Sequence, residues 1–166
     1  MINYNLTKAR IVDNVNDDLS EVGKDLSSFV SNWIDTKHMI LASASLFSDN
    51  SDNLNQVLEQ GQKAGNFVYM YVGSDKGVMT MIPNEQLPDD YDPRTRPWFK
   101  QAKSQNQPIL TPPYIDATSG GLILSFARPT NIGVIAADIG MNEVATEVLN
   151  VDLGETGRAI MIDENG

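Results

Sequence analysis

The N-terminal part of the chain carries a repeating apolar pattern. Its apolar residues follow one another at alternating intervals of three and four positions: Val12, Val15, Leu19, Val22, Leu26, Phe29 and Trp33. This is a heptad seam kept over three repeats, and it predicts a long helix from about residue 3 into the low forties. The seam can pack on the helix's own domain or on the same helix of a second subunit.

Residues 66–82 change to the two-residue period of strands. Phe67, Tyr69 and Tyr71 alternate with other apolar residues, and residues 74–77 supply a turn before 78–82 returns as the partner strand. Most of these tyrosines are expected to fill the core, with one or two lining a pocket. The polar cluster 48–53 is expected to cap a short helix that ends near Lys63.

Three more strands are predicted after a helix that begins near Trp98. They cover residues 107–114, 122–128 and 132–139, and another helix follows to about residue 150. The first of them contains Pro112 and Pro113, which have no amide donors, so it must lie at a sheet edge or be interrupted. The pattern predicts an α+β fold, with the long N-terminal helix packed on a five-stranded antiparallel sheet.

Residues 90–99 bring several chemically useful side chains together. The stretch holds two prolines, two arginines, two acids and three aromatic residues, and the prolines predict a stiff, non-helical loop up to Trp98. Arg96 offers a planar fork of donors that suits a carboxylate, and Tyr91 offers a ring with a hydroxyl. The loop is interpreted as the lip of a pocket for a small organic anion. Alternatively, Trp98 begins an amphipathic helix and the arginines are solvated.

Asp138 is unusual because it stands inside the apolar strand 132–139. A buried carboxylate must be paired or neutralised. Its partner is therefore either a protein group, such as Arg128 or a backbone donor, or the ammonium group of a ligand.

Composition excludes several classes of function. A net charge of −10, with only 12 scattered Lys and Arg residues, disfavours nucleic acid as a partner. The absence of cysteine and the presence of a single histidine, His38, argue against a zinc cluster or a Ser-His-Asp triad, and no metal or cofactor is predicted. His38 itself is expected to be solvated or helix-terminal. No apolar run of eighteen residues and no signal peptide is present, so the sequence read literally is soluble.

Three motifs together resemble a known family. They are YDPRTRPWF at 91–99, PPYID at 112–116 and AADIG at 136–140. They resemble the extracytoplasmic double-Cache sensor domain of bacterial methyl-accepting chemotaxis receptors, in the subgroup that binds amino acids. The likeness covers roughly residues 66–140 and implies that the sheet is PAS-like. Phe99 departs from the family, which commonly has a tyrosine there.

The resemblance implies a site for a small zwitterion. Arg96 and Trp98 would hold an α-carboxylate, and Asp138 would accept the α-ammonium. Tyr91 and Tyr114 would add hydroxyls and ring faces. The implied ligand is an α-amino acid, with a small carboxylate or amine as the alternative.

The resemblance also implies an organisation and a setting. Residues 1–46 would be the long helix, 47–150 the membrane-distal ligand-binding module, and 151–166 a linker and the first strand of a truncated membrane-proximal module. The full-length receptor would be embedded in the inner membrane with this domain in the periplasm, and it would form a homodimer through the N-terminal helix.

Other functions stay open at this point. The same domain type occurs on sensor kinases and cyclase receptors. A carboxylate-based hydrolase would use two acids among Asp90, Asp92, Asp116 and Asp138, but no spacing identifies the pair, and an enzyme is not expected. A dimerisation spacer without a ligand would leave Arg96 without a function.

Overall fold

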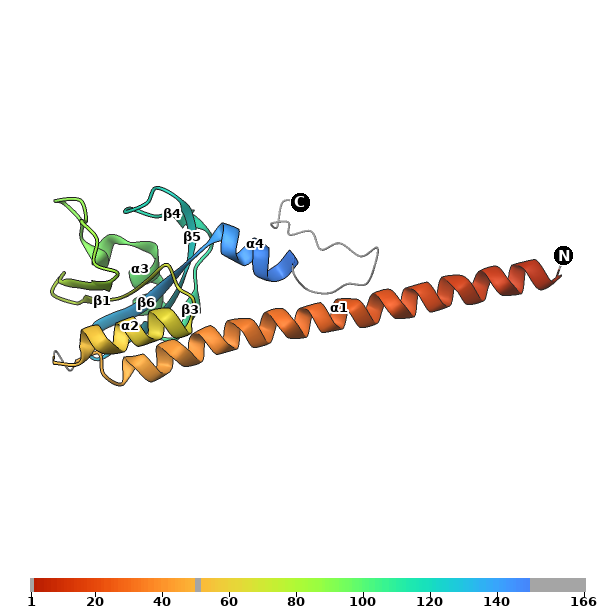
Figure 1. The fold of residues 1–166 in the computed structure, drawn as a ribbon, viewed down its shortest axis with the longest axis horizontal. Helices are drawn as coiled ribbons and strands as arrows, with labels where there is room; N and C mark the ends of the chain where they lie inside the picture. The colour runs from red at the N-terminus through yellow and green to blue at the C-terminus, as the bar shows by residue number, and fades with distance from the viewer. Residues whose placement is uncertain (1, 50–51, 150–166) are drawn as a thin grey trace. The chain divides into compact units, whose positions relative to one another are not determined.

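The computed structural model describes residues 2–49 and 52–149. In chain order its elements are α1 (Ile2–Ser45), α2 (Leu54–Ala64), β1 (Tyr69–Ser74), β2 (Met79–Ile82), η1 (Pro93–Thr95), α3 (Pro97–Gln105), β3 (Ile109–Leu110), β4 (Tyr114–Ile115), β5 (Leu122–Pro129), β6 (Gly133–Gly140) and α4 (Met141–Leu149) (Figure 1). The predicted α+β class and the long N-terminal helix are confirmed. One compact unit comprises residues 35–146 and contains the whole sheet. The residues proposed as an orphan strand, 151–166, lie outside the described part.

The sheet is antiparallel, with strand order β2-β1-β6-β5-β3 and β4 paired with β5. It has six strands because the third predicted strand is split into β3 and β4, which both pair with β5. Pro112 and Pro113 cause the interruption, since neither residue has an amide hydrogen for the ladder. β5 and β6 are the longest strands and pair along their full length.

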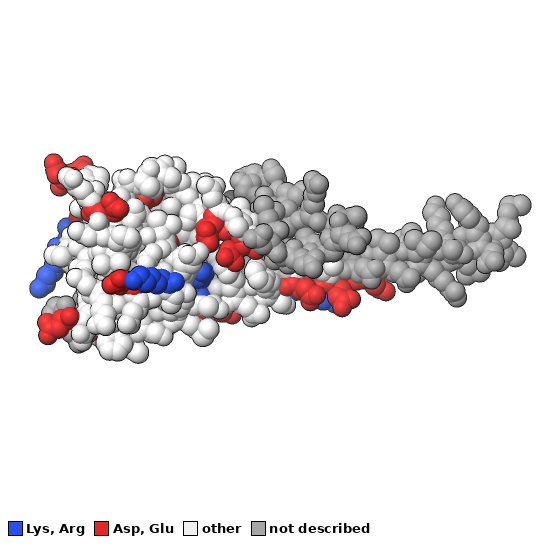
Figure 2. Space-filling model, in the orientation of Figure 1, with Lys and Arg blue, Asp and Glu red and all other residues white. Residues whose placement is uncertain are grey.

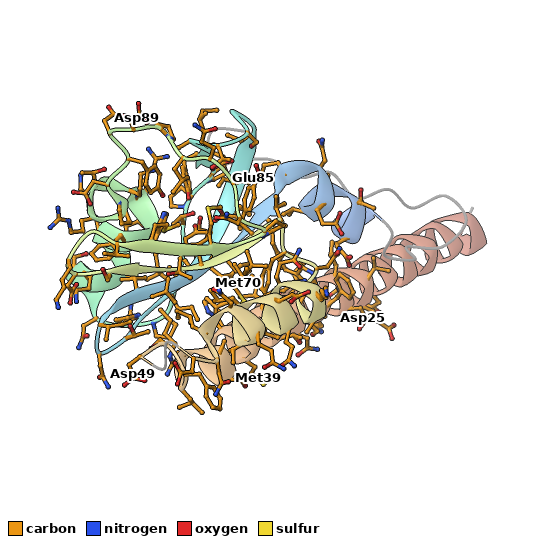
Figure 3. The ribbon with its side chains drawn as sticks, turned by 60° about the vertical axis from the view of Figure 1, so that its left-hand side comes forward. Asp25, Met39, Asp49, Met70, Glu85 and Asp89 are labelled. Atoms are coloured by element: carbon orange, nitrogen blue, oxygen red, sulfur yellow. The ribbon has the colours of Figure 1, made fainter. Side chains whose placement is uncertain are left out.

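The two faces of the sheet are covered by different elements. The C-terminal end of α1 and the whole of α2 lie along one face (Figure 1). Met70 of β1, labelled in Figure 3, points into this layer, where a Cβ on Gly61 of α2 would lie 2.5 Å from its sulfur. Leu41 and Leu58 are fully buried there. The opposite face carries α3 and the loops around it.

The side chain of His38, on α1, packs against the sheet. Its ring meets Phe126 of β5 edge-on with centroids 5.1 Å apart, and burial lowers its pKa. Nearby, the Nζ of Lys37 donates to the carbonyl of Gly65 at 2.5 Å. The expectation of a solvated or helix-terminal histidine is wrong, because α1 continues to Ser45 and holds this turn against the sheet.

Two local expectations also need correction. Pro93–Thr95 forms a short 3-10 helix inside the stretch predicted to be non-helical, and the carboxylate of Asp92 accepts from the Arg94 amide at its start, at 2.9 Å. Proline is well suited to the first position of such a turn. Asn53 stands at the N-cap of α2, as the polar cluster predicts, but its side chain makes no capping hydrogen bond.

Charged side chains are dispersed over the visible surface. Figure 2 shows red and blue groups interspersed on that face, without a continuous basic area. Among residues 2–49 and 52–149, no group of three or more His, Cys, Asp and Glu side chains could hold a metal ion. Within the same ranges, no helix is long and apolar enough to cross a membrane.

Candidate binding pocket

A pocket lies on the face of the sheet opposite α1 and α2. It is lined by Tyr69, Tyr71, Met79, Met81, Leu87, Tyr91, Arg96, Trp98, Tyr114, Asp116, Thr118 and Asp138. The structure therefore brings all five predicted site residues to one place. Strand register explains part of this grouping, because residues paired across neighbouring strands project from the same face of the sheet. Asp138 is paired with Tyr69 on one side and with Ser125 on the other. Glu85 and Asp89, labelled in Figure 3, mark the loop that follows β2.

Asp138 is the buried carboxylate of the pocket, with 3% of its surface exposed. Its Oδ1 accepts two hydrogen bonds, from the Tyr71 hydroxyl at 2.6 Å and from the Ser125 hydroxyl at 2.5 Å. Burial raises its pKa to about 7, and the two hydrogen bonds oppose that rise. No lysine or arginine in the described residues forms an ion pair with Asp138.

The alternative that Asp138 pairs with Arg128 is wrong. Asp138 and Ser125 are register partners and share a face, whereas Arg128 is three residues after Ser125 on the same strand and projects from the other side. Among the described residues, the side chains that donate hydrogen bonds to Asp138 are the neutral hydroxyls of Tyr71 and Ser125.

Ser125 orders the hydroxyl groups around Asp138. It is fully buried, and its hydroxyl lies 2.6 Å from that of Tyr114. Because the single Ser125 proton goes to Asp138, Tyr114 must be the donor in its own contact. The resulting chain runs from Tyr114 through Ser125 to Oδ1 of Asp138. With Oδ1 already bonded to two hydroxyls, Oδ2 is the oxygen left for a cationic ligand group.

Arg96 lies close to two aromatic rings. Its guanidinium carbon lies 5.8 Å from the ring centre of Tyr91 and 5.9 Å from that of Tyr114. One of its nitrogens donates to the carbonyl of Ile115 at 3.3 Å. No carboxylate in the described part of the chain forms an ion pair with it. Arg96 precedes Pro97, which keeps its backbone extended at the start of α3.

Trp98 forms the inner wall of the pocket. Only 1% of its surface is exposed, and its ring meets that of Tyr71 with centroids 4.9 Å apart. Gly73 makes room for it, because a Cβ at that position would lie 2.6 Å from Cη2 of the indole. A hydrogen bond from Trp98 lowers the pKa of Tyr91, although burial raises it overall to about 12. Trp98 therefore positions Tyr91 and Tyr71 in addition to lining the pocket.

Asp116 is a second acidic group in the pocket, and it was not among the five residues predicted for the ligand site. It is 8% exposed, and its Oδ2 accepts from the amide and the hydroxyl of Ser119, both at 2.7 Å. Its charge contributes to the raised pKa of Asp138. Asp116 could have been found from the motif PPYID, since it follows Tyr114 by two residues in an extended segment and projects to the same side.

Ser125 was also missed, although it carries a signal in the sequence. A serine inside the apolar strand Leu122–Pro129 is comparable to the aspartate inside β6. Which of its neighbours it contacts depends on the β5–β6 register, which the sequence does not state.

Comparison with known proteins places these features in a family context. Residues 3–166 match the model of the Cache domain family. The methyl-accepting chemotaxis protein PctB of Pseudomonas aeruginosa is 32% identical over 174 residues, an alignment that covers 100% of this chain and 28% of PctB. McpB of Bacillus subtilis, another methyl-accepting chemotaxis protein, is 32% identical over 99 residues, covering 58% of this chain and 15% of McpB. The chain thus spans less than a third of the length of these relatives.

Solved structures show the same architecture. The ligand-binding domain of the P. aeruginosa amino acid chemoreceptor PctB in complex with L-Arg superposes with a TM-score of 0.78 at 29% identity, covering 88% of this chain and 66% of that one. The ligand-binding domain of the Pseudomonas fluorescens chemoreceptor CtaA in complex with L-isoleucine superposes with a TM-score of 0.79 at 27% identity, covering 88% and 65%.

Proposed function

The chain belongs to the Cache domain family, and we propose that it is the ligand-binding part of a chemoreceptor that recognises an α-amino acid. The observation that carries the proposal is one pocket holding both a guanidinium and a buried carboxylate that are not ion-paired within the described residues. Such an arrangement suits a ligand that brings one charge of each sign.

The chemistry of the pocket divides between the two ends of an amino acid. Arg96 would bind the α-carboxylate, with the rings of Tyr91 and Tyr114 both close to the guanidinium. Oδ2 of Asp138 would accept from the α-ammonium, and Asp116 would add a second negative charge nearby. A simple acid or a simple amine would leave one of these charges desolvated and unpaired, which disfavours its binding.

The relatives support both the ligand class and the signalling context. PctB has been solved with L-Arg and CtaA with L-isoleucine, and both proteins are chemoreceptors. Because PctB and McpB are methyl-accepting chemotaxis proteins, a chemotaxis receptor is favoured over a sensor kinase or a cyclase receptor.

We place the domain outside the cytoplasm, as part of an inner-membrane receptor that forms a homodimer through α1. Val22 and Phe29 on the heptad seam support the dimer, since they are 36% and 38% exposed in this chain. Ligand binding would shift the receptor between existing conformations, with α1 carrying the change towards the membrane. Residues 47–150 would be the ligand-binding module of this assembly.

A thermal-shift screen of the purified chain tests the proposal. The twenty amino acids would be compared with simple carboxylates and amines. At a hundredfold excess over Kd, a ligand adds about 2.7 kcal/mol, which corresponds to a Tm increase on the order of 5–10 °C for a domain of this size. A shift with α-amino acids alone is expected. If simple carboxylates or amines stabilise the chain and amino acids do not, the proposal fails.

A further inference from the structure

We infer, building on the proposed function, that the ligand's side chain lies against an apolar wall made by Met79, Met81 and Leu87. The pocket would accordingly prefer α-amino acids with uncharged aliphatic or thioether side chains.

Strand order sets the direction in which the ligand extends. Asp138 lies on β6, while β2 is separated from β6 by β1. A ligand whose ammonium is bound at Asp138 can therefore place its side chain across the tyrosines of β1 and reach β2. Met81 is opposite Tyr71 and Met79 is opposite Gly73 in the β1–β2 ladder, so both methionines project from the face that carries Asp138.

The wall opposite the charged end of the pocket has no ionisable group. Met81 is buried at 7% exposure, while Met79 and Leu87 are half-buried and keep apolar surface that a ligand could cover. Methionine is flexible and polarisable, so two adjacent methionines can adapt to aliphatic side chains of different shapes.

The acidic residues of the pocket do not provide a site for a charged side chain. Oδ2 of Asp116 is bonded to Ser119, and the charge of Asp116 acts on Asp138, at the ammonium end. Glu85, on the loop after β2, is exposed, so water and salt screen its attraction for a cation. An anionic side chain would meet these acids as like charges and has no second arginine in the pocket lining.

Titration calorimetry of the 166-residue chain with four ligands tests this inference. L-leucine should bind at least about 100-fold more tightly than glycine, because each methylene in an apolar pocket contributes roughly tenfold or more. L-arginine and L-aspartate should bind more weakly than L-leucine. Tighter binding of either charged amino acid, or equal affinity for glycine and L-leucine, would overturn the side-chain assignment and leave the proposed function standing. Loss of binding to every amino acid would overturn the proposed function itself.

Variants of the wall separate a direct contact from general damage. Met81→Ala and Leu87→Ala should each weaken L-leucine binding by about tenfold more than they weaken glycine binding. Thr80→Ala is the matched control, since Thr80 lies between the two methionines and projects from the opposite face of β2. The ratio of leucine to glycine affinity should fall in the two wall variants and stay constant in the control. A ratio that is unchanged in both wall variants contradicts the assignment.

Discussion

Acidification from about pH 8 to about pH 5 should weaken amino-acid binding by about 100-fold. Burial raises the pKa of Asp138 to about 7 in the ligand-free pocket, so about nine-tenths of the carboxyl groups are charged at pH 8 and about one-hundredth at pH 5. The ligand's ammonium requires the charged form. Binding must therefore displace a proton at low pH, and affinity falls as pH falls through 7.

Calorimetry at several pH values measures this effect directly. The dissociation constant should rise about tenfold per pH unit below the midpoint. At pH 7, titrations in buffers with different ionisation enthalpies should show release of about half a proton per ligand bound. In Asp138→Asn the pH dependence should disappear and binding should be lost or severely weakened, since the variant has no charge to offer the ammonium. A wild-type dissociation constant that stays level from pH 5 to pH 8 would refute the reasoning.

Other perturbations lead to distinct outcomes. The raised pKa of Asp138 means that the free energy of unfolding falls as pH rises through about 7, because the buried carboxyl group becomes charged. In a melting series of the ligand-free chain, Asp138→Asn should therefore raise the Tm by at least about 5 °C at pH 8 and change it little at pH 4. Arg96→Ala should abolish binding in calorimetry. Arg94→Ala is the control and should bind like wild type, because Arg94 is exposed and pairs with Asp92 outside the pocket. Ser125→Ala should weaken binding about tenfold and move the midpoint of its pH dependence above 7, because the variant removes a hydrogen bond that lowers the pKa of Asp138. An unchanged midpoint would contradict that role. Gly133→Ala should destabilise the fold by about 2 kcal/mol or more in urea unfolding, since its Cβ would lie 2.1 Å from a carbonyl oxygen of β1.

The pocket and the part of α1 from residue 35 to residue 45 lie on opposite faces of the sheet. Asp138 projects from one face of β6, and its neighbours Ala137 and Ile139 project into the layer where α1 and α2 pack. Both neighbours are fully buried. A shift of β6 on ligand binding would therefore be transmitted to the packing on the opposite face, because closely packed layers move together.

Periodicity was enough to predict most elements of the fold. A seam repeated over three heptads is strong evidence for a helix, and the alternation at residues 66–82 is strong evidence for a hairpin. The prolines at 112 and 113 indicated the break in the third predicted strand, because a missing amide hydrogen is a property of the residue itself. The environment of His38 could not be read in the same way, since it depends on Phe126, which lies far along the chain.

For the site, residue chemistry nominated Arg96 and Asp138 without knowledge of their surroundings. A guanidinium in a proline-bounded loop and an aspartate in an apolar strand are both unusual, and that can be judged from the local sequence. Tyr91 and Trp98 were nominated together with Arg96 from the chemistry of the same loop. Tyr114 came from the family's motifs. Their role in binding remains a prediction.

What the sequence by itself determined is the identity and order of the elements and the charged groups that a ligand would meet. These depend on periodicity and on residue type, which are local properties. Only the tertiary structure decided that Ser125 and Tyr71 share one oxygen of Asp138, and that Met79 and Met81 face the pocket. The reason is that strand register and strand order bring together residues from distant segments, and a shift of one residue would turn each of these side chains to the opposite face.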